Sequence, residues 1–367
     1  MSPHSGTSGS SSLRPLIVSS FIPKQGICSL VVESPDDLWI LRRLIGPGDT
    51  IVTKSSRVSK KEDEYSRPDR GERIKVTIAL VVESVSLDSS VGRLRVRGRI
   101  SESSDDSVST AGSHSVSVSP GYGLTLRKSD WTPLDTTILN SAKASRTFLV
   151  VTMDRREAGI GTLSGSHLSI TATIDSGASG KGGQEVDQEP YLRKIVGVLA
   201  NTWRSGDLIV VAGPGHTKLA LANRIAAHPE MGKSYIVLEG FDLSGADGVR
   251  NLVKFEGFKK VASDSVLVEV QEIVEQVIKR ITQGDTKVAY TLARVRQAAM
   301  AGAVESCVVS DDVFTQDIDE QELVDTLNKV EQLGGRVYLC DSSLETGKQV
   351  SSFGGMVATL RYSFKPY

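Results

Sequence analysis

The chain has 367 residues, more than one hydrophobic core usually supports, so we expect about three domains. Its 43 Lys and Arg residues nearly balance its 44 Asp and Glu residues, which gives a net charge of -1. This balance excludes a polycation that binds nucleic acid over its whole surface, so any such contact must be local. No apolar run approaches the ~20 residues needed to span a bilayer, and we therefore expect no membrane association.

The cysteines and the N-terminal residues indicate the cellular compartment of the protein. Cys28, Cys307 and Cys340 are far apart in the sequence and lack metal-ligand spacing, which indicates reduced thiols in a cytoplasmic protein. Residues 1–13 are polar and lack the charged segment and apolar run of a signal peptide. We expect them to form a disordered tail.

Residues 14–140 are predicted to form a small β-barrel or sandwich. Short strand patterns separated by turn residues recur there, as LIVSSFI, GICSLVVES, TIVTK, RIKVTIALVVESVSL, RLRVRGRI, HSVSVS and YGLTLRK. One helix interrupts them. It begins at Pro35, carries Asp36 and Asp37 in its first turn, and ends before Gly46.

Two groups of basic residues in this segment point to nucleic acid. The first follows the strand after the helix and contains Lys54, Arg57, Lys60 and Lys61. The second contains Arg93, Arg95, Arg97 and Arg99, which alternate with Leu94, Val96, Gly98 and Ile100. A period of two places the arginines on one face of a strand. Such charge usually marks a solvated face, but four arginines without an interleaved acid equally indicate a surface that contacts phosphates.

Residues 146–262 are predicted to form a mixed α/β domain. TFLVVTMD, EAGIGTLSG and LSITATID follow one another as a three-stranded meander. After a glycine-rich loop come a helix opened by Pro190, the buried strand LIVVAG, a helix over residues 218–227 and the strand SYIVLEG. Residues 141–145 are predicted to be a linker.

Residues 265–367 are predicted to form a third domain in which helices cover a sheet. A helix over residues 265–283 keeps a helical apolar period up to Gly284. Helix and strand patterns then alternate to the strand MVATLRY.

The sequence provides no strong catalytic motif. The strings around Lys181 and Lys218 lack the glycine or hydroxyl residue that a phosphate-binding loop requires, so we predict no NTP site. The five histidines show no HExxH pattern, and no GxSxG motif occurs. The carboxylates Asp36, Asp37, Asp49 and Glu83 are best explained by helix capping and surface charge. Whether two of them converge on a divalent metal ion for phosphodiester cleavage stays open.

The tripeptide Gly182, Gly183 and Gln184 is a second open question. Two glycines let the backbone approach a substrate closely, and the glutamine beside them could orient a water molecule. The acidic residues that follow, Glu185 and Asp187, oppose binding of this loop within an RNA-lined site.

Two segments at opposite ends of the chain resemble the Pelota family, the ribosome-rescue paralogues of archaeal and eukaryotic class-1 peptide release factors. They are PDDLWILRRLIGPGD with its basic loop, and GDTKVAYTLARVRQAAMAGAVESCVVSDDVF with the later GGMVATLRYSF. The resemblance implies a multidomain α+β protein. It would contain an Sm-like β-barrel, a ribonuclease-H-like α/β domain and an α/β sandwich like the kink-turn-binding ribosomal proteins.

The resemblance also implies a function in mRNA surveillance, namely rescue of stalled ribosomes and no-go decay. A Pelota protein enters the empty A site as a tRNA mimic, so both basic groups would face mRNA and ribosomal RNA. The implied partners are a GTP-bound GTPase like elongation factor 1 alpha and an ABC-type ATPase that splits ribosomes. The chain itself would be a cytoplasmic monomer.

The resemblance implies further sites. The family contacts its GTPase through a PGF-type turn, which here reads Pro214, Gly215, His216, Thr217, Lys218, with histidine in place of phenylalanine. A metal-dependent endoribonuclease in the first domain is one alternative, and it would use a divalent cation as its cofactor; the resemblance implies no certain cofactor. A peptide release factor is another, because release factors carry their catalytic GGQ in the corresponding loop. The stop-codon motif NIKS of release factors does not occur.

Overall fold

The computed structural model describes residues 16–58, 73–88, 92–105, 113–143, 146–177, 187–263, 265–315 and 318–363. The chain divides into two compact units, one made of Pro15–Ala144 and Asp312–Gly334 and the other containing Ser145–Asp311 and Gly335–Tyr367. The boundaries of the three predicted domains therefore stay predictions. Among the described helices, none combines the length and the apolar character that crossing a bilayer requires.

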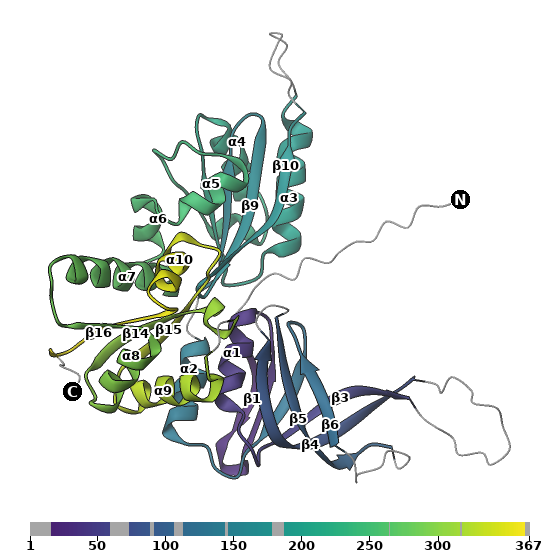
Figure 1. The fold of residues 1–367 in the computed structure, drawn as a ribbon. Helices are drawn as coiled ribbons and strands as arrows, with labels where there is room; N and C mark the ends of the chain where they lie inside the picture. The colour runs from purple at the N-terminus through teal and green to yellow at the C-terminus, as the bar shows by residue number, and fades with distance from the viewer. Residues whose placement is uncertain are drawn as a thin grey trace. The chain divides into compact units, whose positions relative to one another are not determined.

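The first unit contains a seven-stranded antiparallel sheet (Figure 1). Its strands are β1 (Ile17–Ile22), β2 (Ile27–Val31), β3 (Thr50–Val58), β4 (Arg73–Asp88), β5 (Arg93–Ser103), β6 (Ser113–Val118) and β7 (Gly123–Arg127), and a 3-10 turn covers Pro23–Gln25. They pair in the order β1-β2-β7-β3-β4-β5-β6. Each of the seven predicted strand segments thus contains a strand.

Two helices close this sheet against one core. The predicted helix α1 (Pro35–Leu44) buries Leu38, Leu41 and Leu44 together with inward residues of the strands. A second helix, α2 (Pro133–Lys143), was not predicted and extends into the expected linker. Its first turn is a capping box, because Asp135 accepts from the N–H of Thr132 (2.9 Å) and donates its own N–H to the Thr132 hydroxyl (3.1 Å).

A buried capping box also begins α1. The carboxylate of Asp37 accepts hydrogen bonds from the N–H groups of Glu33 (2.7 Å) and Ser34 (2.8 Å), while the Ser34 hydroxyl accepts from the Asp37 N–H. Asp37 is 1% exposed. Burial raises the pKa of Asp37 to about 7, although the hydrogen bonds from Glu33 and Ser34 act in the opposite direction.

The raised pKa of Asp37 predicts that the first unit is more stable in mild acid. The folded state holds a proton that the unfolded state releases near pH 4, so this contribution is complete below that pH and is lost as the pH rises through 7. Between pH 5 and pH 8 the free energy of unfolding should fall by about 2–3 kcal/mol from this group. Urea unfolding should show this dependence in the native chain and in an Asp130→Asn control. It should be absent in Asp37→Asn, and an equal pH dependence in that variant would refute the assignment.

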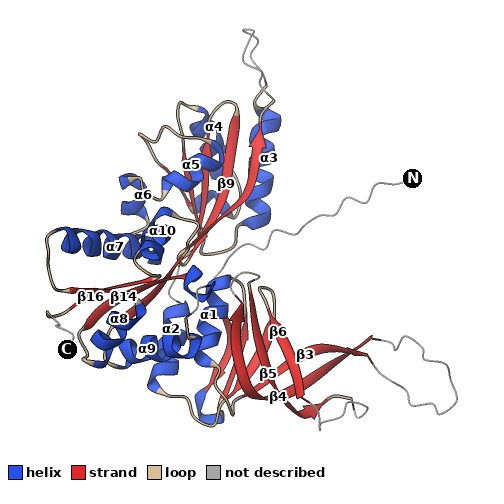
Figure 2. Cartoon of the chain, in the orientation of Figure 1, coloured by secondary structure: helices blue, strands red, loops and turns tan. Residues whose placement is uncertain are grey.

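The second unit contains a five-stranded mixed sheet with helices on both faces (Figure 2). Its strands are β8 (Phe148–Met153), β9 (Glu157–Ser164), β10 (His167–Asp175), β11 (Leu208–Ala212) and β12 (Tyr235–Val237) in the order β10-β9-β8-β11-β12. The first three form the predicted antiparallel meander, and β8, β11 and β12 are parallel. Along β8, Phe148 and Val150 face one core while Leu149 and Val151 face another.

The helices of this sheet include two that the sequence did not predict. Helices α3 (Glu189–Thr202) and α4 (Thr217–Ala226) pack on one face, and the unpredicted α5 (Gly245–Leu252) and α6 (Glu256–Val261) pack on the other. A 3-10 turn covers Met231–Lys233.

The second unit also contains a four-stranded sheet. Its strands are β13 (Val288–Tyr290), β14 (Val304–Ser310), β15 (Arg336–Cys340) and β16 (Met356–Leu360) in the order β13-β16-β14-β15. Only β14 and β15 are parallel neighbours among these described strands. The accompanying helices are α7 (Val266–Thr282), α8 (Leu292–Met300) and α10 (Glu345–Ser352), and the apolar stripe of α7 lies in the core as predicted. Helix α9 (Glu320–Gln332) belongs to the first unit.

Candidate nucleic-acid interface

Strand β5 carries the predicted arginines on its outer face. Along the strand exposed and buried residues alternate strictly from Arg93 to Ile100. All four arginines are exposed, whereas Leu94, Val96 and Ile100 lie in the core of the unit. The predicted period-two arrangement is therefore confirmed.

A glycine lets the neighbouring strand come close behind these arginines. Gly98 occupies an inward position of β5, where a Cβ atom would lie 1.9 Å from the carbonyl oxygen of Val81 on β4. The pairing of β4 with β5 shifts register between Val82 and Ser84. Such bulges bend a strand and increase its twist, and here the glycine makes room for the displaced backbone.

Serines flank the arginines on both neighbouring strands. Arg95 and Arg97 lie opposite Ser86 and Ser84 of β4, and opposite Ser117 and Ser115 of β6. Arg99 lies opposite Ser113 of β6. Directly opposed residues share one face of a sheet, and all five serines are exposed. We call these nine residues the arginine–serine face. It combines guanidinium groups with hydroxyl donors, the groups that bind phosphate and ribose oxygens.

The four guanidinium groups differ in whether they already form ion pairs or hydrogen bonds within the chain. Arg99 donates to Glu83 (2.8 Å), and both side chains are exposed, so this ion pair is weak. Arg97 donates to the Ser113 hydroxyl (3.2 Å). Arg93 and Arg95 form no ion pair with any residue that the structure describes. Three of the four guanidinium groups therefore form no ion pair with a described residue, although the exposed Asp88 of β4 lies opposite Arg93.

The second basic group is only partly described. Lys54 is exposed on β3, where its carbonyl accepts a hydrogen bond from the Tyr122 hydroxyl (2.7 Å). Both residues line an open cleft of about 560 Å³ whose wall includes the hydroxyls of Ser19, Ser29, Thr53, Thr77 and Thr125. The backbone of Arg57 continues β3, but its side chain lies outside the described residues, as do Lys60 and Lys61 entirely.

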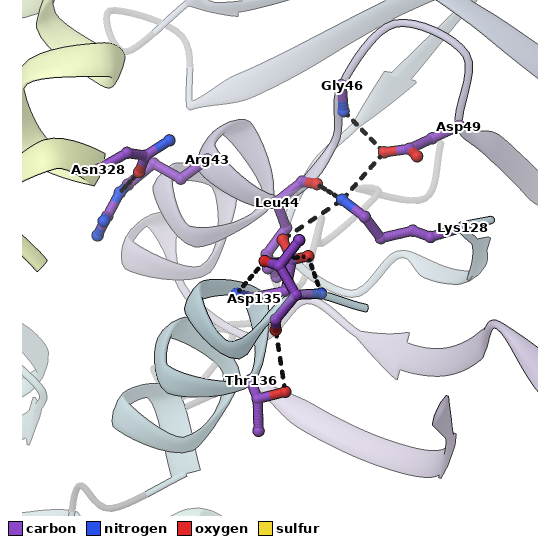
Figure 3. Close-up of polar contacts among 9 residues, drawn as sticks. Arg43, Leu44, Gly46, Asp49, Lys128, Asp135, Thr136 and Asn328 are labelled. Atoms are coloured by element: carbon purple, nitrogen blue, oxygen red, sulfur yellow. Dashed lines mark hydrogen bonds and ion pairs between the residues drawn. The ribbon is translucent and has the colours of Figure 1, made fainter. Parts of the chain in front are cut away.

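Lys128 connects the end of α1 to α2 and to the loop before β3 (Figure 3). Its ammonium group donates to the carbonyl of Leu44 (2.6 Å) and forms ion pairs with Asp49 (3.2 Å) and Asp135 (3.4 Å). The three charged side chains are only 9–13% exposed. Nearby on α1, Arg43 donates to Asn328 (3.1 Å) of α9. This buried charge cluster was not predicted from the sequence, although the Thr-Pro-Leu-Asp capping signal before α2 could have identified Asp135.

Three of the four carboxylates considered for metal binding are engaged in structural contacts. Asp37 caps α1, Asp49 accepts from Gly46 (2.8 Å) and pairs with Lys128, and Glu83 pairs with Arg99. Among the described residues, three metal-binding side chains lie close together in one group. They are His167, Asp311 and Asp341, all in the second unit. No first-unit carboxylate is part of that cluster.

Comparisons with known proteins agree with this architecture. Residues 17–143 match the Pelota N-terminal domain, and residues 267–364 match eRF1 domain 3. A protein pelota homolog of Nitrosopumilus maritimus is 38% identical over 343 residues, which cover 93% of this chain and 98% of that protein. The chain belongs to the Pelota family. A pelota homolog of Pyrococcus horikoshii is 30% identical over 94% of this chain and 98% of its own length.

A solved structure extends the Pelota likeness to the fold. The crystal structure of the Thermoplasma acidophilum Pelota protein covers 95% of this chain and 99% of its own, with a TM-score of 0.62 at 21% identity. The predicted fold class, a multidomain α+β protein of the Pelota kind, is thereby confirmed.

The turn predicted to contact a Pelota-type GTPase follows β11. Gly213 and Gly215 adopt left-handed φ angles of 133° and 70°, and a Cβ on Gly213 would lie 2.0 Å from the Met153 carbonyl. His216 is exposed at the start of α4. Lys218 is buried, donates to the Gly213 carbonyl (2.9 Å) and pairs with Glu239 (2.8 Å). Its side chain therefore stabilises the turn from within, while Gly215 and His216 are exposed. Gly182, Gly183 and Gln184 lie outside the described residues.

Proposed function

We propose that this Pelota-family chain rescues stalled ribosomes and serves mRNA surveillance by binding in the vacant A site, with the arginine–serine face toward RNA. Membership of the family over nearly the whole chain supports the function. The row of exposed arginines on β5, flanked by serines, is the observation that supports this RNA interface. Contacts of this kind neutralise phosphates and do not depend on base sequence.

In this proposal the chain acts as an adaptor made of three modules, residues 14–140, 146–262 and 265–367. The first module binds mRNA and ribosomal RNA. The exposed part of the turn, Gly215 and His216, contacts a GTP-bound GTPase like elongation factor 1 alpha, and Lys218 holds that turn in shape. An ABC-type ATPase then splits the ribosome, and no-go decay of the mRNA follows.

Two alternative activities have less support. An endoribonuclease in the first module would need carboxylates free to bind a divalent metal ion, whereas Asp37, Asp49 and Glu83 already have partners. A peptide release factor would use Gly182, Gly183 and Gln184. The acidic residues that follow this tripeptide oppose that role.

Ribosomes stalled on a truncated mRNA test the proposed function. With the GTPase, the ABC-type ATPase and nucleotide present, the chain should convert stalled ribosomes to subunits and leave the peptide attached to tRNA. A tRNA bound in the A site should block the reaction, because it fills the same space. Peptide release that depends on Gln184, measured with Gln184→Ala as the comparison, would establish a release factor instead. RNA cleavage in a manganese titration would establish the nuclease.

A further inference from the structure

Three metal-binding side chains meet in the second unit, whereas the arginine–serine face belongs to the first unit. Asp311 follows β14 directly and Asp341 follows β15 directly, and these strands are parallel neighbours with Ser310 opposite Cys340. The carboxyl ends of parallel neighbours lie at one edge of a sheet, so the two carboxylates must come together there. His167 begins β10 and places its Nε2 atom 3.7 Å from Oδ2 of Asp311.

The backbone orients both carboxylates in the same way. Oδ1 of Asp311 accepts the N–H of Ser342 (2.9 Å), and Oδ1 of Asp341 accepts the N–H of Ser343 (2.8 Å). On the other side of the imidazole, Nδ1 of His167 lies 3.4 Å from the Ser166 hydroxyl. Hydrogen bonds of this kind to the second atom of a ligand are the usual means by which proteins fix metal-binding side chains.

An unsatisfied buried amide is the independent sign of a ligand. Gln271 of α7 is 7% exposed, and its Oε1 atom has no hydrogen-bond partner among the described residues. It lines a cavity of about 10 Å³ together with Asp341 and with Ser166, the residue before His167, whereas His167 and Asp311 are not part of the described lining. This volume is about that of one water molecule or ion. A buried carbonyl oxygen without a hydrogen-bond partner lowers the stability of the folded state unless a bound water molecule or ion contacts it.

We propose that His167, Asp311, Asp341 and Gln271 form a site for one divalent transition-metal cation of the zinc class. The ligand atoms of the first three lie within 4.8 Å of one another. Ligands held at about 2.0–2.2 Å from a tetrahedral Zn²⁺ are about 3.3–3.6 Å apart, so the most widely separated pair must approach by about 1.2–1.5 Å when the ion binds. One imidazole nitrogen among oxygen donors favours Zn²⁺ over Mg²⁺. The site stabilises the second unit and is separate from RNA binding.

Zinc binding by the full-length chain, stripped with a chelator, tests the site. Equilibrium dialysis should find one tightly bound Zn²⁺ per chain and no comparable affinity for Mg²⁺. His167→Gln and Asp341→Asn should each weaken zinc binding by about 10-fold or more. His228→Gln and Asp242→Asn, changes of the same kind elsewhere in the second unit, should leave binding unchanged. Zinc should also raise the melting temperature of the native chain and not that of Asp341→Asn.

The variant Gln271→Leu tests whether Gln271 is a metal ligand or only a structural side chain. Without metal this variant should be at least as stable as the native chain, because it removes an unpaired polar atom. With zinc it should gain less stability than the native chain. Absence of saturable zinc binding would show that the cavity holds water only and would overturn the proposal. Equal zinc affinity in His167→Gln, Asp341→Asn and the native chain would overturn it too.

Discussion

Replacing Lys128 by methionine should lower the free energy of unfolding of the first unit by about 3–5 kcal/mol. The substitution leaves two carboxylates, Asp49 and Asp135, without their shared cation, and leaves the Leu44 carbonyl without its donor. The ammonium group also lies 5.6 Å from the centre of the Trp131 ring, a contact that methionine would keep only as packing. Because all three charged side chains are largely buried, water cannot compensate for the loss.

Urea unfolding followed by tryptophan fluorescence measures this effect. In a Trp203→Phe background the signal comes only from Trp39 and Trp131, both in the first unit. Arg127→Met is the matched control, since Arg127 pairs with Glu102 at the surface and its loss should cost less than about 1 kcal/mol. Adding Asp49→Asn and Asp135→Asn to Lys128→Met should recover part of the stability. Equal losses in Lys128→Met and Arg127→Met would contradict the buried network.

Regular patterns in the sequence predicted the elements that depend on local geometry alone. The alternation from Arg93 to Ile100 specifies a strand with one charged face wherever that strand lies. The apolar stripe of α7 similarly predicts a buried helix. Helix α2 was missed because its capping signal was not used, and α5 was missed because Gly245 and Gly248 weaken the helical pattern.

Contacts between distant segments could not be predicted in this way. The serines beside Arg95 and Arg97 depend on a register that includes a bulge. Gly98 within the strand pattern is a local sign of a bulge, but it does not specify which residue of the partner strand is displaced. Asp311 and Asp341 each follow an apparent strand in the sequence, but their meeting requires β14 and β15 to be parallel neighbours. Lys128 lies beside Asp49 because β3 pairs with β7, where Thr50 is opposite Arg127, and it also contacts Asp135 in the first turn of α2.

The arginines of β5 should account for much of the affinity for ribosomes. Replacing Arg93, Arg95 and Arg97 by glutamine removes three charges that form no ion pair with a described residue. We expect the dissociation constant for ribosomes with a vacant A site to rise about 100-fold near 0.15 M salt. Each lost phosphate contact should also lower the slope of log affinity against log salt by about 1. The side chains point outward, so stability should change little.

A control variant separates this local effect from a change in net charge. Arg155, Arg156 and Arg204 are exposed in the second unit, and their replacement by glutamine removes the same charge. Their loss should weaken binding less than threefold and leave the salt slope near the native value, because non-contacting charges act only at long range.

The salt dependence of ribosome binding by the Arg93, Arg95 and Arg97 triple variant is the most direct measurement. If the arginine–serine face contacts ribosomal RNA, the triple variant binds more weakly and loses about three units of slope, whereas the control variant does not. Native affinity and native slope in the triple variant would contradict the account, because the phosphates would then be bound elsewhere on the chain.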